Sequence, residues 1–195
     1  MAYHLHLFVA MELMDVLRNR RAVREYTDHP IGRQLIERLI GAAILAPSAV
    51  NLQPWEFAVL LDPKRIDSYA ERARKWLIEN PVEAALPDEA REILEKPGFS
   101  IFYHAPALVV VMAQTCLRQK IEDCCLAAQN LMLAARDEGI GSCWIGFGRP
   151  WLNLPSTKKE LGLSEEYCVV APVVLGYPVA WPQSHGRNPA KIHWL

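Results

Sequence analysis

The chain has 195 residues, which fits one domain, and 51% of them are hydrophobic and 22% charged, an ordinary globular composition. Its 21 lysines and arginines balance 22 aspartates and glutamates, so charge gives no argument for a nucleic-acid partner or an anionic membrane surface. No stretch reaches the roughly 18 apolar residues of a membrane span, and we expect no membrane association.

The cysteines number five, an odd count, and include no Cys-x-x-Cys pair: Cys116, Cys124, Cys125, Cys143 and Cys168. They lie in apolar sequence surroundings, and no histidine clusters with them, so their spacing predicts no zinc or other metal site. We predict buried free thiols in a protein of the reducing cytoplasm.

The N-terminal part begins with an apolar segment, residues 1–10, that lacks the basic start and cleavage site of a signal peptide. We interpret it as an N-terminal extension and expect residues 11–195 to form a single domain. Apolar residues at helical spacing predict a helix over residues 12–20 and another over residues 33–45.

The rest of the chain alternates buried apolar runs with helical patterns. Strands are predicted over residues 57–61, 107–113 and 167–177, a short strand or loop over 142–147, and helices from residue 63, over 122–138 and over 157–161. Residues 64–98 are charged and interrupted by three prolines, so they are a possible lid. We predict a sheet covered by helices on both faces, followed by an irregular proline-rich tail.

Residues 46–55, between the second helix and the first strand, hold Ser48, Asn51, Gln53 and Trp55 together with two prolines. Polar amides beside an aromatic ring suit a ligand with a flat apolar body and a polar edge. The same segment also fits a well-packed connection in which Ser48 and Asn51 bond the local backbone.

An arginine cluster follows the first predicted helix and consists of Arg20, Arg21 and Arg24. Guanidinium groups make bidentate, charge-assisted hydrogen bonds to phosphate, so the cluster is a candidate phosphate site. The alternative is a solvated basic helix end that complements the helix dipole.

Four glycines lie within residues 139–148, where a predicted helix precedes and a predicted strand follows. This order is the reverse of the dinucleotide-binding fingerprint, which needs a strand first and a helix afterwards. The glycines instead indicate a backbone that runs close to a flat group, with amides free to donate to a heteroatom that gains electrons.

The order and spacing of these three motifs resemble the FMN-dependent nitroreductase family, from about residue 11 to residue 187. Further matching segments are residues 26–31, 105–111, 123–135 and 173–178. The resemblance implies an α+β fold in three α/β/α layers, with a mixed, mainly antiparallel sheet flanked by helices. It also implies a homodimer with FMN sites at the interface and a tail swapped onto the partner subunit.

The resemblance assigns Arg20 and Arg21 to the FMN phosphate and Arg24 to the pyrimidine edge of the flavin. A serine is usual where this chain has Ala22, so one hydroxyl ligand of the phosphate is missing. Arg187, in the tail, matches a basic residue that closes on the phosphate.

The remaining assignments concern the flavin ring. Ser48 would reach the FMN of the other subunit, and Asn51 the polar rim of the isoalloxazine in its own subunit, with Gln53 beside it. The backbone at Ile145 and Gly146 would face flavin N5, the atom that accepts hydride.

The implied activity is ping-pong transfer of hydride from NAD(P)H, through FMN, to a nitroaromatic, a quinone or a similar small electron acceptor. The flavin supplies the chemistry, so no side chain is assigned a catalytic role. The alternatives are a reductive dehalogenase of iodotyrosine, a flavin-degrading enzyme, a non-enzymatic FMN-binding or storage protein, and a structural dimer with a vacant cofactor site.

Overall fold

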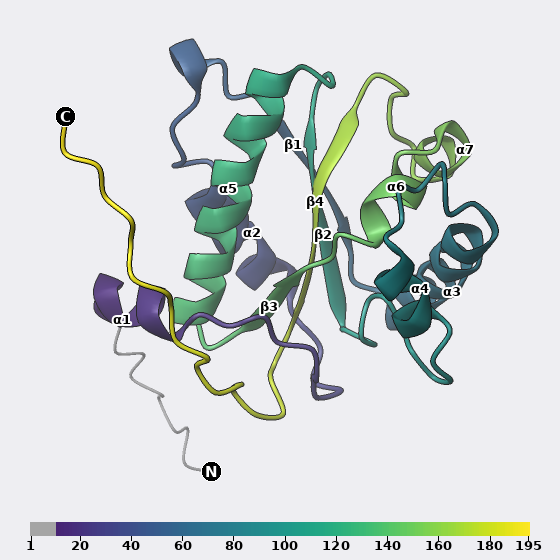
Figure 1. Cartoon of the computed structure of the whole chain (residues 1–195), viewed down its shortest axis with the longest axis horizontal. Coiled ribbons are helices and arrows are strands. Elements are labelled where there is room, and N and C mark those ends of the chain that lie inside the picture. Colours follow the sequence, from purple (N-terminus) through teal and green to yellow (C-terminus); the bar gives the residue numbers. More distant parts are fainter. Residues whose placement is uncertain (1–10) are drawn as a thin grey trace.

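The computed structural model describes residues 11–195, so the predicted extension over residues 1–10 lies outside the described part of the chain (Figure 1). One sheet has the strand order β1-β2-β4-β3, and every neighbouring pair is antiparallel. Its strands are β1 (Trp55–Leu60), β2 (Ala107–Ala113), β3 (Gly141–Trp144) and β4 (Cys168–Gly176). An isolated parallel bridge between Ala22 and Ser142 makes the arrangement mixed but mainly antiparallel, as expected.

Helices cover both faces of this sheet and give the predicted three layers (Figure 1). They are α1 (Leu13–Asn19), α2 (Arg33–Ala43), α3 (Pro63–Glu79), α4 (Asp88–Leu94), α5 (Arg118–Asp137), α6 (Gly148–Leu152) and α7 (Pro155–Glu160), with a 3-10 turn η1 (Ala49–Asn51). Helices α2 and α5 pack on one face, while α3 and α6 pack on the other with α4 and α7 beside them. Within residues 11–195 no helix combines the length and the apolar character needed to cross a bilayer.

Strand β2 lies between β1 and β4, and this position inside the sheet explains why its sequence is continuously apolar. Alternate side chains point to opposite faces of a strand. Val109 and Val111 accordingly belong to the core under α2 and α5, whereas Leu108 and Val110 belong to the core under α3 and α6. Both faces are covered, so neither set carries polar residues.

Helix α3 forms the first part of the charged segment over residues 64–98. Its residues Ile66, Ala73 and Leu77 are 0% exposed and belong to the second core. The same core includes Leu94 of α4, which is also 0% exposed, so both halves of the segment contribute to it, and the lid over residues 64–98 stays a prediction.

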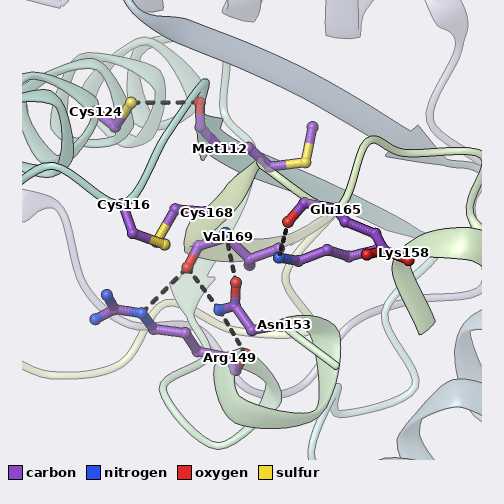
Figure 2. The surroundings of a disulfide bond; sticks show 9 residues. All are labelled: Met112, Cys116, Cys124, Arg149, Asn153, Lys158, Glu165, Cys168 and Val169. Carbon is purple, nitrogen blue, oxygen red and sulfur yellow. Dashed lines mark hydrogen bonds between the residues drawn. A yellow bond between two sulfur atoms is a disulfide. The ribbon is translucent and has the colours of Figure 1, made fainter. Parts of the chain in front are cut away.

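The prediction of five free thiols is wrong for two of them, because Cys116 and Cys168 form a disulfide (Figure 2). Antiparallel pairing of β2 with β4 places Ala113 opposite Cys168, and Cys116 follows only three residues later. Their Cα atoms are 5.0 Å apart although 52 positions separate them in sequence, so local spacing could not reveal the pair. The free cysteines are Cys124 and Cys143, both buried, and the half-buried Cys125.

A bulge in β4 lies beside this disulfide, because the register skips Val170. The side-chain amide of Asn153 pairs with the backbone there: its Oδ1 accepts from the Val169 N–H at 2.9 Å and its Nδ2 donates to the Val169 carbonyl at 3.0 Å (Figure 2). The Nε of Arg149 donates to the same carbonyl at 3.1 Å. These bonds fasten α6 to the sheet and so fix the loop that precedes α6.

Candidate functional site

The arginine cluster lies on an extended segment, because α1 ends at Asn19. The Val23 N–H donates to the Ser142 carbonyl of β3 at 3.0 Å, so the segment runs along the edge of the sheet. A side chain at Gly141 would place its Cβ 2.8 Å from Val23 Cγ1. One glycine of the glycine-rich motif is therefore needed for close packing of the arginine segment.

A cavity of about 340 Å³ opens beside this segment, lined by Leu17, Arg18, Arg21, Ser184, Gly186 and Arg187. Arg20 adjoins it: burial, followed by repulsion from Arg187 and Arg21, lowers the pKa of Arg20. The structure thus brings together the three residues predicted to hold a phosphate. None of the three forms an ion pair with a carboxylate among the described side chains.

The tail reaches this cavity within the same chain. The Val179 N–H donates to the Glu25 carbonyl at 3.1 Å, and the tail then leads Arg187 to the arginine segment. Beyond it the tail passes α1 and leaves the body of the molecule (Figure 1). Arg187 therefore joins Arg20 and Arg21 without any contribution from a second subunit.

A second cavity of about 330 Å³ is lined by Arg24, Ile101, Tyr103, Cys143, Trp144, Ile145, Gly146 and Phe147. The lining includes Arg24, which was predicted at the edge of the flavin, and Ile145 and Gly146, whose backbone was predicted to face flavin N5. The Ile145 N–H already donates to the Pro172 carbonyl at 2.8 Å, so it is not free for a ligand. The Gly146 N–H has no backbone acceptor among the described residues, and a Cβ at Gly146 would meet nothing within 4 Å.

Tyr103 is a residue of this cavity that the sequence did not single out. Its ring centroid lies 5.8 Å from Arg24 Cζ, and its backbone has a φ of 53°, in the left-handed region that few non-glycine residues adopt. Such a strained conformation is often associated with a functional site. No sequence signal marks a left-handed tyrosine, which explains why it was missed.

Ser48, Asn51 and Gln53 form one hydrogen-bonded loop around η1. The Gln53 N–H donates to Ser48 Oγ at 3.0 Å, and Gln53 Nε2 donates to Asn51 Oδ1 at 3.1 Å. Val50, Asn51 and Gln53 all have positive φ. Ser48 thus bonds local backbone, as the simpler interpretation held, and the loop lines neither cavity.

Asp123, also missed from the sequence, anchors this loop to α5. It is 5% exposed, its Oδ1 accepts from the Ala49 N–H at 3.1 Å, and its Oδ2 has no hydrogen-bond partner among the described residues. At the other end of α5, Asp137 Oδ1 accepts from the Met11 N–H beside α1. Fourteen residues of helix separate the two carboxylates, about 21 Å. The loop and the arginine cluster therefore lie toward opposite ends of α5.

Comparison with known proteins matches residues 17–177 to the sequence pattern of the nitroreductase family. The chain is 31% identical over 186 residues to an Archaeoglobus fulgidus protein named as an NADH dehydrogenase/NAD(P)H nitroreductase, covering 93% of this chain and 97% of that protein. It is also 31% identical over 193 residues to an iodotyrosine deiodinase of Thermotoga neapolitana, with the same coverages of 93% and 97%. A nitroreductase of Bacteroides fragilis, solved with bound FMN, superposes with a TM-score of 0.80 at 26% identity over 95% of this chain and 99% of that one. A match that extends over most of the sequence and the whole fold shows that this chain belongs to the nitroreductase family.

Proposed function

We propose that the protein is an NAD(P)H-dependent FMN oxidoreductase that reduces nitroaromatic compounds, quinones or similar electron-poor acceptors by a ping-pong mechanism. The observation that carries this proposal is a cluster of guanidinium groups next to a cavity lined by Gly146; within residues 11–195 the guanidinium groups have no carboxylate partner and the Gly146 N–H has no backbone acceptor. The FMN bound to the Bacteroides fragilis relative and the nitroreductase name of the Archaeoglobus fulgidus relative support it.

The arginine cluster fits the phosphate of FMN. The Nε of Arg21 is buried and has no hydrogen-bond partner among the described residues, and burial beside other cations lowers the pKa of Arg20. A phosphate dianion would accept from the first and neutralise the repulsion felt by the second. Ala22 offers no hydroxyl, so in this chain the guanidinium groups would hold the phosphate.

The second cavity fits the flavin ring. FMN, when bound, supplies the atom that accepts and donates hydride. Arg24 would place a cation at the pyrimidine edge, where negative charge accumulates on reduction. Gly146 would offer its N–H to the ring, while the apolar walls formed by Ile101 and Phe147 would exclude water.

We further propose a homodimer in which the loop around η1 completes the site of the partner subunit. Exposed apolar residues gather on α1, at the end of α2, around η1 and on α5: Leu13, Met14, Leu17, Ile44, Leu45, Val50, Leu52, Leu117 and Leu126. Large apolar side chains exposed along one side of the α2–α5 layer are typical of an interaction site. Because Asn51 shares a loop with Ser48, toward the opposite end of α5 from the arginine cluster, we assign both residues to the partner's flavin and revise the own-subunit assignment of Asn51.

The test is anaerobic titration of the purified protein with FMN and then with NADH or NADPH, followed by a screen of acceptors. We expect the bound flavin to bleach and to recolour with a nitroarene or a quinone. The screen includes 3-iodotyrosine, since the Thermotoga neapolitana relative is as similar as the nitroreductase one. A protein that does not bind FMN would refute the proposal, and a bound flavin that neither nicotinamide reduces would favour a storage role.

A matched pair of variants tests the phosphate assignment. Arg20→Ala with Arg21→Ala should weaken FMN binding by about 1.5–3 kcal/mol for each charge-assisted contact that is lost. Arg33→Ala, which removes an exposed charge at the start of α2, should leave FMN affinity unchanged. Isothermal titration calorimetry on both variants would measure this, and equal affinities would remove the assignment.

A further inference from the structure

One more arginine, Arg136, was not part of the predicted site and stacks on Trp181, which lines a hollow together with Ala22, Val23 and Arg24 of the arginine segment. Arg136 is in the last turn of α5, and its Cζ lies 3.7 Å from the ring centroid of Trp181 in the tail. Its Nε is buried and has no hydrogen-bond partner among the described residues. A guanidinium stacked on an indole at this distance is held in place by cation–π attraction.

The neighbouring acids do not neutralise Arg136. Asp137 accepts from the Met11 N–H, and Glu138 pairs with Arg38 through two hydrogen bonds of 2.8 and 3.0 Å. Among the described side chains no carboxylate forms an ion pair with Arg136. Both acids follow Arg136 directly in the helix, at positions that do not face it, so neither is placed to pair with it.

Arg136 instead experiences the charge of another cation, Arg21. Burial, followed by repulsion from Arg21, lowers the pKa of Arg136, just as burial and repulsion from Arg187 and Arg21 lower the pKa of Arg20. Four guanidinium groups from three separate segments therefore share one region. Like charges gathered in this way repel one another, and an anion bound among them would relieve that repulsion.

We propose that Arg136 is a fourth cation of the phosphate site, that it compensates for the hydroxyl absent at Ala22, and that Trp181 positions it. The ligand class is a phosphate monoester, and the inference rests on the proposed binding of FMN. Trp181 and Arg187 belong to the same tail, so one bound phosphate would fasten the tail at two points. Arg136 is thus the phosphate-binding residue and Trp181 the positioning residue.

The experiment compares the dissociation constants of FMN and of riboflavin, which lacks the phosphate, by titration of the apoprotein. For Arg136→Met we expect FMN to bind about tenfold more weakly, while riboflavin affinity changes by less than about twofold. For Trp181→Leu we expect a smaller loss, about threefold, again for FMN alone. Arg118→Met is the control, because it removes one exposed charge from the opposite end of the same helix. It should change neither constant.

The outcomes separate this inference from the proposed function. If Arg136→Met weakens the binding of FMN and of riboflavin equally, or changes the binding of neither, Arg136 does not act on the phosphate and the inference is overturned. If the Arg20 and Arg21 variants lose FMN selectively while Arg136→Met does not, the proposed function stands and only the inference falls. A wild-type protein that binds neither flavin overturns both. If the methionine variant folds poorly, Arg136→Lys, which keeps the charge, serves in its place. Retention of most FMN affinity by Arg136→Lys supports the inference, and a tenfold loss opposes it.

Discussion

Individual glycines of the motif over residues 139–148 serve different purposes. Gly141 lets Val23 approach β3, since a Cβ there would lie 2.8 Å from Val23 Cγ1. Gly146 lines the second cavity and has open space where its Cβ would be, and its N–H has no backbone acceptor among the described residues. The first glycine is required by packing, whereas the second leaves room for a ligand.

This difference predicts opposite behaviour of two alanine variants. Gly141→Ala should lower the free energy of unfolding by about 1–3 kcal/mol, because the arginine segment must shift. It should also weaken FMN binding, and an added Val23→Ala should restore part of both. Gly146→Ala should keep the stability of the wild-type protein. Urea unfolding and FMN titration measure these effects, and a Gly141→Ala protein of unchanged stability would contradict the packing argument.

The ion pair that joins α2 to the end of α5 should make the stability of the protein depend on pH. Arg38 donates two hydrogen bonds to Glu138, and this bonding holds the pKa of Glu138 below its ordinary value. A carboxylate with a lowered pKa stabilises the folded state above its unfolded pKa, and the stabilisation is lost as the pH falls through the folded value. We expect Arg38→Met to reduce stability at pH 7 but not at pH 3, measured by urea unfolding at both values. An equal loss at both would show that packing, not charge, is responsible. Arg118→Met serves for comparison, because it removes an exposed ion pair, Arg118 with Glu122, that lies within a single helix.

Elements were predictable from the sequence where the apolar pattern was strong. The strand over residues 107–113 was predicted with the observed bounds because both of its faces are buried. Helix α5 begins at Arg118 rather than at residue 122, since its first residues are mostly polar and add little to the apolar period. Helix α3 was predicted from residue 63, but the burial of one face was not, because that face includes alanines, such as Ala70 and Ala73, among many charged residues.

Relations across the whole molecule were less predictable. The resemblance supplied the arginines and Gly146, and the structure gathers them at two cavities. Arg136 and Tyr103 come from segments without a motif, so only the tertiary structure places them near the site. The Ser48 loop lies about 21 Å along α5 from the end of the helix that is near the arginine cluster. No local sequence pattern predicts this separation.

The disulfide is a second property of the whole molecule, because it closes a long loop between β2 and β4. Such a bond restricts the unfolded chain, and its loss should lower stability by about 2–4 kcal/mol. We expect Cys116→Ser to lower the melting temperature, a reductant to do the same to the wild-type protein, and Cys125→Ser to leave it unchanged. Alkylation of the denatured protein, followed by mass spectrometry, should label three cysteines without reductant and five with it. Five labels without reductant would show that the bond does not form.

The proposed dimer can be tested by mixing two defective subunits. The Arg20→Ala, Arg21→Ala double variant has a damaged phosphate site, and Asn51→Ala has a damaged loop. If each site combines the arginines of one subunit with the loop of the other, a mixed dimer contains one intact site and one doubly damaged site. After unfolding and refolding of an equal mixture, about a quarter of all sites should then bind FMN normally, because half of the dimers are mixed. Arginines and a loop from the same subunit would leave every mixed dimer without an intact site. The recovered fraction of tight FMN binding therefore decides to which subunit Asn51 contributes.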